Sequence, residues 1–127
     1  MAVRATPEPE SADKWEVQFR KGCLELAILA VLWSDRLYGL EIMRRLAYGS
    51  GLIVPEGTVY PLLSRLKAEG LLSSEWVEAD AGHPRKYYRL TAEGSKALAE
   101  KRKEWLQFAG AINRVLGGNA HAVAPAN

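Results

Sequence analysis

The sequence has little of the chemistry that metal sites and disulfides need: it contains one cysteine and two histidines. Cys23 has no partner for an intrachain disulfide or a thiolate metal cluster, which is consistent with a reducing compartment. His83 and His121 lie far apart in the chain, without other ligand-type residues at metal-binding spacing. We therefore expect no metal site and no cofactor.

Signals for export, membrane insertion and catalysis are also lacking. The N-terminus has no apolar signal core, and the longest apolar stretch is shorter than the roughly 20 residues that a bilayer span needs. The sequence shows no nucleophile elbow, glycine-rich phosphate loop or paired carboxylates that would indicate an enzyme. We expect a cytoplasmic protein that is not an enzyme and has no membrane partner.

What the chain does contain is typical of one small globular domain. Its 127 residues are 48% hydrophobic and 25% charged, which predicts a packed core. The net charge of +2 is too small to identify a nucleic-acid partner by itself. The positive charge is local, however, because Arg85, Lys86 and Arg89 follow His83 with no acid among them.

The apolar periodicity predicts three helices in the first half of the chain. The first covers residues 15–33, with Gly22 as a candidate break, and the second covers residues 38–48. Pro55 and Glu56 open the third, which ends at Gly70. Pro61 predicts either a bend in this helix or a later start at Thr58, and we favour the earlier start with a bend.

A β-hairpin and a last helix follow. Residues 72–78 and 85–90 are rich in β-forming residues and are separated by a turn-like segment. Thr91 is suited to N-cap a helix that runs to about Leu116. We expect Tyr88 and Leu90 to face the core, and Trp33 and Trp76 to be core residues as well.

This order predicts a fold that is mainly α with a small β-hairpin, a winged helix-turn-helix followed by a long C-terminal dimerisation helix. We expect a disordered tail at residues 1–11, the winged helix-turn-helix at 12–91, the dimerisation helix at 92–116 and a disordered tail at 117–127. In this fold the third helix enters the major groove of DNA and the hairpin, or wing, lies along the flanking backbone.

Polar side chains of the third helix and the wing, together with Tyr38 at the start of the second helix, are the candidates for DNA contact. Hydroxyl groups bond phosphates or base edges, arginine pairs with guanine, and lysine neutralises phosphate. The predicted DNA-binding residues are Tyr38, Thr58, Tyr60, Ser64, Arg65, Lys67, Arg85 and Lys86.

Four stretches resemble the PadR-like family of transcriptional regulators. They are residues 37–42, 57–63, 66–72 and 85–91, which occur in the order of that family and extend the resemblance over about residues 20–95. The resemblance implies a dimeric regulator that binds double-stranded DNA, in most cases a repressor. The single final helix is similar to that of the compact subgroup. For some members the resemblance also implies a small aromatic effector near the dimer interface, for which Trp15 and Trp105 are the candidates here.

The final helix carries an apolar stripe that a small domain has little surface to cover, which favours a homodimer. The predicted interface residues are Leu98, Trp105, Phe108, Ile112, Val115 and Leu116.

Two other functions remain open from the sequence, a winged-helix module that binds proteins without DNA, and a small-molecule carrier. A DNA regulator loses duplex affinity steeply as salt rises, whereas a protein-binding module has no duplex affinity to lose. A carrier would bind its ligand tightly and leave DNA affinity unchanged.

Overall fold

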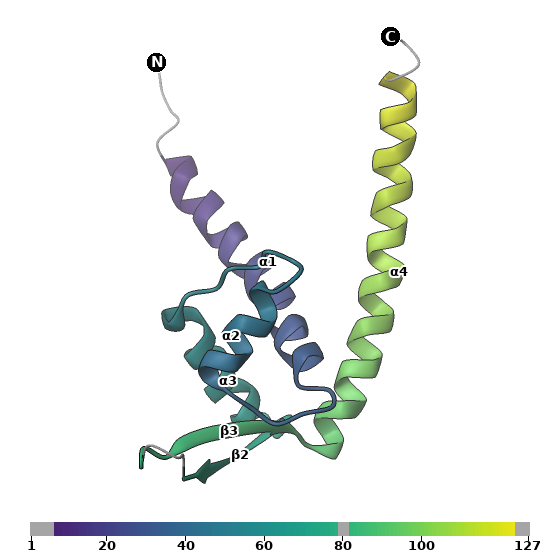
Figure 1. Cartoon of the computed structure of the whole chain (residues 1–127). Helices are drawn as coiled ribbons and strands as arrows, with labels where there is room; N and C mark the ends of the chain where they lie inside the picture. Colours follow the sequence, from purple (N-terminus) through teal and green to yellow (C-terminus); the bar gives the residue numbers. More distant parts are fainter. Residues whose placement is uncertain (1–6, 79–81, 124–127) are drawn as a thin grey trace.

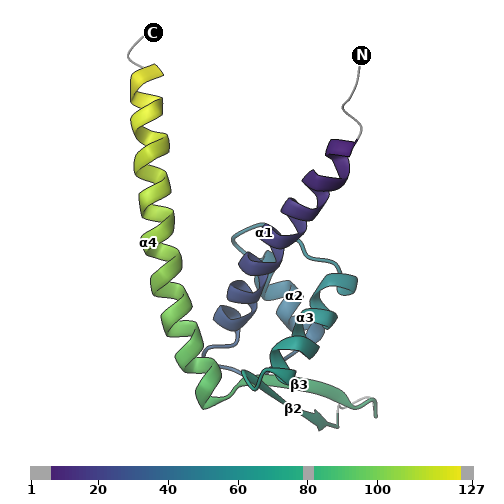
Figure 2. The same ribbon diagram turned by 180° about the vertical axis from the view of Figure 1, so that it is seen from behind.

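The winged helix-turn-helix order is confirmed by a computed structural model, which describes the backbone of residues 7–78 and 82–123 and the side chains of residues 18–78 and 82–117. The elements are α1 (Pro7–Val31), β1 (Leu37–Tyr38), α2 (Gly39–Ala47), α3 (Glu56–Ala68), β2 (Leu72–Val77), β3 (Arg85–Leu90) and α4 (Ala92–Val123). Figure 1 shows α1, α2 and α3 gathered above the sheet, while α4 rises beside them as a separate rod. Figure 2 shows from behind that α1 and α4 diverge toward the two chain ends.

Helix α1 is continuous, so the break considered at Gly22 is wrong. Gly22 is exposed, and no other part of the chain comes near the position that its Cβ would occupy. The roughly 1 kcal/mol penalty of a helical glycine is outweighed by the burial of Leu24, Ile28 and Leu29 on the following turns. The helix also begins at Pro7, inside the segment that we expected to be a tail.

The core lies where α1, α2 and α3 meet. Its most deeply buried side chains come from all three helices and the residue that follows α1: Ile28, Leu29, Leu32, Ile42, Val59, Leu63 and Leu66. These positions follow helical spacing within each segment, which is why the periodicity of the sequence predicts the elements correctly. The packing fixes the orientation of α3 relative to the rest of the domain.

Helix α3 has the earlier of the two starts considered. Pro55 is its N-cap residue, and the backbone N–H groups of Thr58 and Val59 both donate to the Pro55 carbonyl oxygen, at 2.9 and 3.1 Å. Pro61 lies inside the helix, where it lacks the N–H group of an ordinary helical residue.

The sheet has three antiparallel strands in the order β1-β3-β2. In the predicted hairpin, Leu72 is opposite Leu90 and Val77 is opposite Arg85. Strand β1 was not predicted, because two residues are too few to show a strand period. Tyr88 is buried as expected, and Leu90 is partly buried against the core.

Thr91 caps α4 as predicted and joins it to the end of α3. The Gly94 N–H donates to Thr91 Oγ1 at 2.9 Å, and the Thr91 hydroxyl donates to the Gly70 carbonyl oxygen at 2.6 Å. The Thr91 N–H also donates to the Leu71 carbonyl oxygen, at 3.1 Å. Helix α4 continues to Val123, beyond the end expected near Leu116. Within the described residues, no helix is long and apolar enough to cross a bilayer.

Candidate nucleic-acid interface

The outward side of α3 is lined by small and compact residues. The buried stripe of this helix consists of Val59, Leu62, Leu63 and Leu66. Opposite that stripe, at helical spacing, lie the exposed residues Gly57, Pro61, Ser64 and Ala68. A helix with such short side chains on its outer face allows its backbone to approach a groove closely.

Tyr60 and Lys67, which are two turns apart, lie on the flank of α3 that faces the sheet. The Tyr60 side chain is 41% exposed. Its hydroxyl lies so close to α2 that a Cβ on Gly39 would stand 2.1 Å from the Tyr60 hydroxyl oxygen. Burial raises the pKa of the Tyr88 hydroxyl, and the neighbouring Tyr60 raises it further. Tyr60 is therefore packed on its inner edge and accessible on its outer edge.

Thr58 and Arg65 lie on the other flank of α3, the one that faces α1. Arg65 Nη1 is 2.9 Å from Glu25 Oε2 of α1, and Arg65 Nε donates to Glu69 Oε2 at 3.1 Å. Burial raises the pKa of the Glu25 carboxyl, Glu69 raises it further, and the charge of Lys101 opposes that shift. This geometry favours a structural role for Arg65, as a link between α1 and α3, over the base contact that the sequence suggested.

The face of the wing that points away from α3 carries stacked arginines. The Arg85 guanidinium lies 4.5 Å from the centroid of the Tyr38 ring, which packs edge-on against Tyr87 at 5.4 Å. The Arg36 guanidinium lies over Tyr87, 4.8 Å from the ring centroid, and pairs with the Glu75 carboxylate. The Tyr38 N–H donates to Glu41 Oε1 at 3.2 Å, so Tyr38 is held firmly at the start of α2.

Lys86 lies on the opposite face of β3, the same face as buried Tyr88, because side chains alternate along a strand. Its Nζ is 5.7 Å from the centroid of the Trp76 ring and 5.8 Å from that of Tyr88. The sequence grouped Arg85 and Lys86 at one shoulder, whereas the structure separates them onto the two faces of the wing. A wing lying along DNA would bring both charges near phosphates.

Trp33 and Trp76 are 72% and 67% exposed, so their assignment to the core is wrong. Trp33 follows the end of α1, outside the helix packing. Trp76 is directly opposite Lys86 near the tip of the hairpin, beyond the part of the sheet that the helices cover. Its place close to the hairpin turn was the signal in the sequence that could have identified it as a surface residue of the wing.

The apolar stripe of α4 is largely exposed in the single chain. Trp105 and Ile112 are each 41% exposed, while Phe108, Val115 and Leu116 are between 58% and 62% exposed. Leu98 differs, because it packs against the core of its own chain. The effector candidate Trp15 lies in α1, but its side chain is outside the residues whose side chains are described.

The three-helix core, the exposed face of α3 and the basic wing define a winged helix-turn-helix protein. Residues 28–100 match the transcriptional regulator PadR-like family, and the chain belongs to that family. It is therefore a transcriptional regulator and not an enzyme, and its class binds DNA. Among the described residues, no group of His, Cys, Asp or Glu could hold a metal ion.

Relatives agree with this assignment over most of their length. The transcriptional regulator Rv3488 of Mycobacterium tuberculosis is 36% identical over 104 residues, which are 82% of this chain and 92% of that protein. A PadR-like transcription factor from Bacteroides fragilis has 43% identity and a TM-score of 0.70, covering 80% of this chain and 98% of its own. A PadR-like regulator from Bacillus cereus has 33% identity and a TM-score of 0.69, covering 78% and 96%.

Proposed function

We propose that this protein is a repressor that binds a palindromic operator in double-stranded DNA as a homodimer, and that a small aromatic effector releases it. The observation that carries the proposal is the combination of an α3 face free of bulky side chains with a basic wing beside it. An α-helix of this shape can enter the major groove while the wing follows the backbone.

The two flanks of α3 would take different parts in this complex. Tyr60 and Lys67 lie toward the wing, where the outer edge of the Tyr60 ring and the Lys67 ammonium group can reach base edges and phosphates. Ser64 occupies the outer face itself, and Thr58 borders it on the α1 side. Tyr38, at the start of α2, would meet the sugar-phosphate backbone together with Arg85.

The exposed stripe of α4 supports the dimer. Trp105, Phe108, Ile112 and Val115 alternate at spacings of three and four residues, as in the seam of a coiled coil. An apolar strip of this length is seldom left in water, and a second copy of the same helix provides a cover of matching chemistry. Two recognition helices would then face half-sites about 34 Å apart.

Trp105 supports the effector proposal, since its ring lies at the start of this seam and is 41% exposed. A planar aromatic molecule could stack on it between the two chains. A ligand held there would alter the angle between the α4 helices, and with it the distance between the recognition helices. Repression follows from occupancy, because a dimer bound across a promoter excludes other proteins from the same DNA.

The decisive experiment is selection of bound duplexes from a random pool, followed by titration of the selected site at several salt concentrations. We expect a two-fold symmetric consensus and a steep loss of affinity as salt rises. A protein-binding module would select no duplex. A small-molecule carrier would bind its ligand without any change in the duplex affinity measured by the same titration. Either result would refute the proposed function.

We predict that Arg85→Ala together with Lys86→Ala weakens specific and non-specific duplexes by similar factors. The salt slope should fall by about 0.9 for each phosphate that the variant no longer neutralises. Affinity should be measured by fluorescence anisotropy between low and moderate salt. The matched control is Lys96→Ala with Lys103→Ala, which removes two charges from α4, away from the wing, and should leave the slope unchanged. A weakening confined to one base position would contradict the phosphate assignment.

We further predict that Tyr60→Ala weakens operator binding by about 1–3 kcal/mol, whereas Arg65→Ala acts mainly on folding. The reason is that the outer edge of Tyr60 is accessible, while Arg65 is paired with Glu25 and Glu69. Operator titration and urea unfolding of both variants separate the two effects. If Arg65→Ala changed the preferred base at one operator position without changing stability, Arg65 would be a base contact after all.

A further inference from the structure

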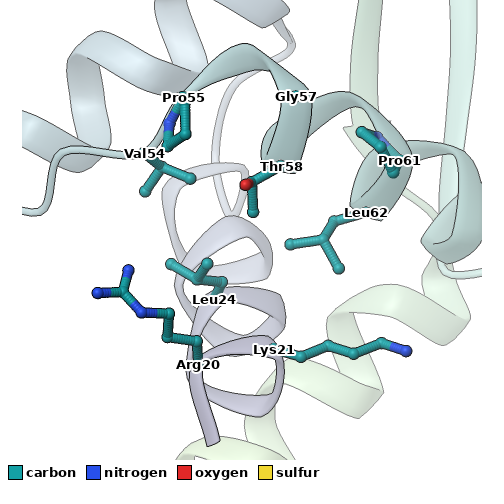
Figure 3. A pocket seen from close by; sticks show the side chains of 9 residues that line it. All are labelled: Arg20, Lys21, Leu24, Val54, Pro55, Gly57, Thr58, Pro61 and Leu62. Carbon is teal, nitrogen blue, oxygen red and sulfur yellow. The ribbon is translucent and has the colours of Figure 1, made fainter. Parts of the chain in front are cut away.

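Helix α3 borders different surfaces on its two flanks. On the α1 side lies a hollow of about 290 Å³, where Thr58 and Leu62 project from α3 toward Leu24 (Figure 3). On the sheet side, the surface continues from the half-exposed ring of Tyr60 to the buried ring of Tyr88, and from there along the wing. The sheet side is therefore the flank on which other side chains extend the surface of α3 outward.

Trp76 lies on the face of the wing that is turned toward the helices. It is directly opposite Lys86 in the hairpin, and Lys86 shares a face with Tyr88, because side chains alternate along a strand. Tyr88 is buried, whereas Trp76 is exposed, since the hairpin extends past the helices at this point (Figure 1). One face of the sheet thus changes from core to an exposed indole ring beside α3.

Lys86 places a positive charge beside this ring. Its Nζ is 5.7 Å from the centroid of the Trp76 ring and 5.8 Å from that of the Tyr88 ring. A cation at such a distance is attracted by the negative face of an aromatic ring, so the two rings help to hold the ammonium group in place. The wing therefore presents an exposed apolar ring and a cation side by side.

The backbone of DNA has the complementary arrangement, because the apolar carbons of each deoxyribose are flanked by phosphate anions. We propose that Trp76 packs against a deoxyribose of the duplex while Lys86 neutralises the adjacent phosphate. This inference rests on the proposed function, since it requires a duplex seated on α3. It assigns to Trp76 a part of the duplex affinity that comes from apolar burial and is independent of salt.

The test is titration of the selected operator and of an unrelated duplex with wild type and Trp76→Ala at several salt concentrations. We expect Trp76→Ala to weaken both duplexes by similar factors, about tenfold, because an aromatic contact to the backbone is lost. The slope of log affinity against log salt should stay the same, since the variant removes no charge. Trp76→Phe keeps a ring and should recover most of the affinity.

Trp33→Ala is the matched control, because Trp33 has a similar exposed fraction at the other end of β3. It lines a hollow together with Leu90, the last residue of that strand. This control should leave the affinity for both duplexes unchanged. Light scattering and urea unfolding of each variant show that the oligomeric state and the fold are those of the wild type.

Acrylamide quenching provides a measurement that needs no alanine variant. Duplex should protect part of the tryptophan fluorescence of the wild type, and Trp76→Phe should lose that protection. Equal protection in both proteins would overturn the inference, as would equal operator affinity of wild type and Trp76→Ala. A flatter salt slope in Trp76→Ala would also overturn it, because the ring would then act only by positioning Lys86. In these three cases the proposed function stands, whereas a wild type that binds no duplex would overturn both.

Discussion

Aspartate in place of both Ile112 and Leu116 should convert the proposed homodimer to monomers and lower operator affinity about 100-fold or more. Each carboxylate would have to lose its hydration in an apolar seam, and two-fold symmetry in the proposed dimer would place every substitution in the interface twice. A monomer binds one half-site at a time and loses the effective concentration that links the two half-sites. Light scattering and operator titration of the same sample measure both effects.

A matched control introduces the same two charges outside the seam. Gln107→Asp with Asn113→Asp changes exposed residues of α4 that lie off the apolar stripe, so dimer mass and operator affinity should remain nearly those of the wild type. A wild-type protein that is monomeric at micromolar concentration would contradict the dimer. So would an Ile112 and Leu116 variant that stays dimeric and binds the operator normally.

Gly94→Ala should destabilise the folded protein by at least about 2 kcal/mol, although alanine is the better helix former. A Cβ on Gly94 would stand 2.0 Å from the Leu71 carbonyl oxygen and 3.3 Å from Leu90 Cδ2. The oxygen belongs to the backbone of the turn after α3, so relief of this overlap requires α4 to move. Urea unfolding at fixed protein concentration measures the change.

Gly22→Ala is the control for this variant, because it is the same substitution at an exposed helical position with open space around it. It should stabilise the protein by roughly 0.5–1 kcal/mol. If Gly22→Ala raises the free energy of unfolding and Gly94→Ala lowers it, the close approach to Leu71, and not helix propensity, determines the effect at Gly94. Two stabilised proteins would mean that α4 moves away from the turn at no cost in stability.

The elements with a strong periodic signal could be predicted from the sequence. The stripe of α3 follows helical spacing, and the hairpin strands alternate around Tyr88, so local order alone indicates their type and burial. The Thr91 cap is likewise a local event, which needs only a hydroxyl beside the first turn of a helix. The family resemblance depends on the same segments.

The features that could not be predicted depend on where the core ends in space. Trp33 and Trp76 have the size and hydrophobicity of core residues, but each lies just past the last layer of packing. From the sequence, Arg65 is a reasonable DNA contact. In the structure α1 packs on α3 and places Glu25, which is distant in sequence, 2.9 Å from the Arg65 guanidinium. Periodicity reports which face of an element is apolar, and it contains no information about the distance between elements.

The corner at Thr91 and Gly94 has a consequence for DNA phasing. Because this corner fastens the turn after α3 to the first turn of α4, α3 cannot rotate independently of α4. In the proposed dimer the angular offset between the two half-sites is then built into each chain. One base pair inserted between half-sites rotates the second by about 35° around the DNA axis. A rigid corner cannot twist to compensate for this rotation. Operator affinity would therefore depend on the spacing between the half-sites as strongly as on their base sequence.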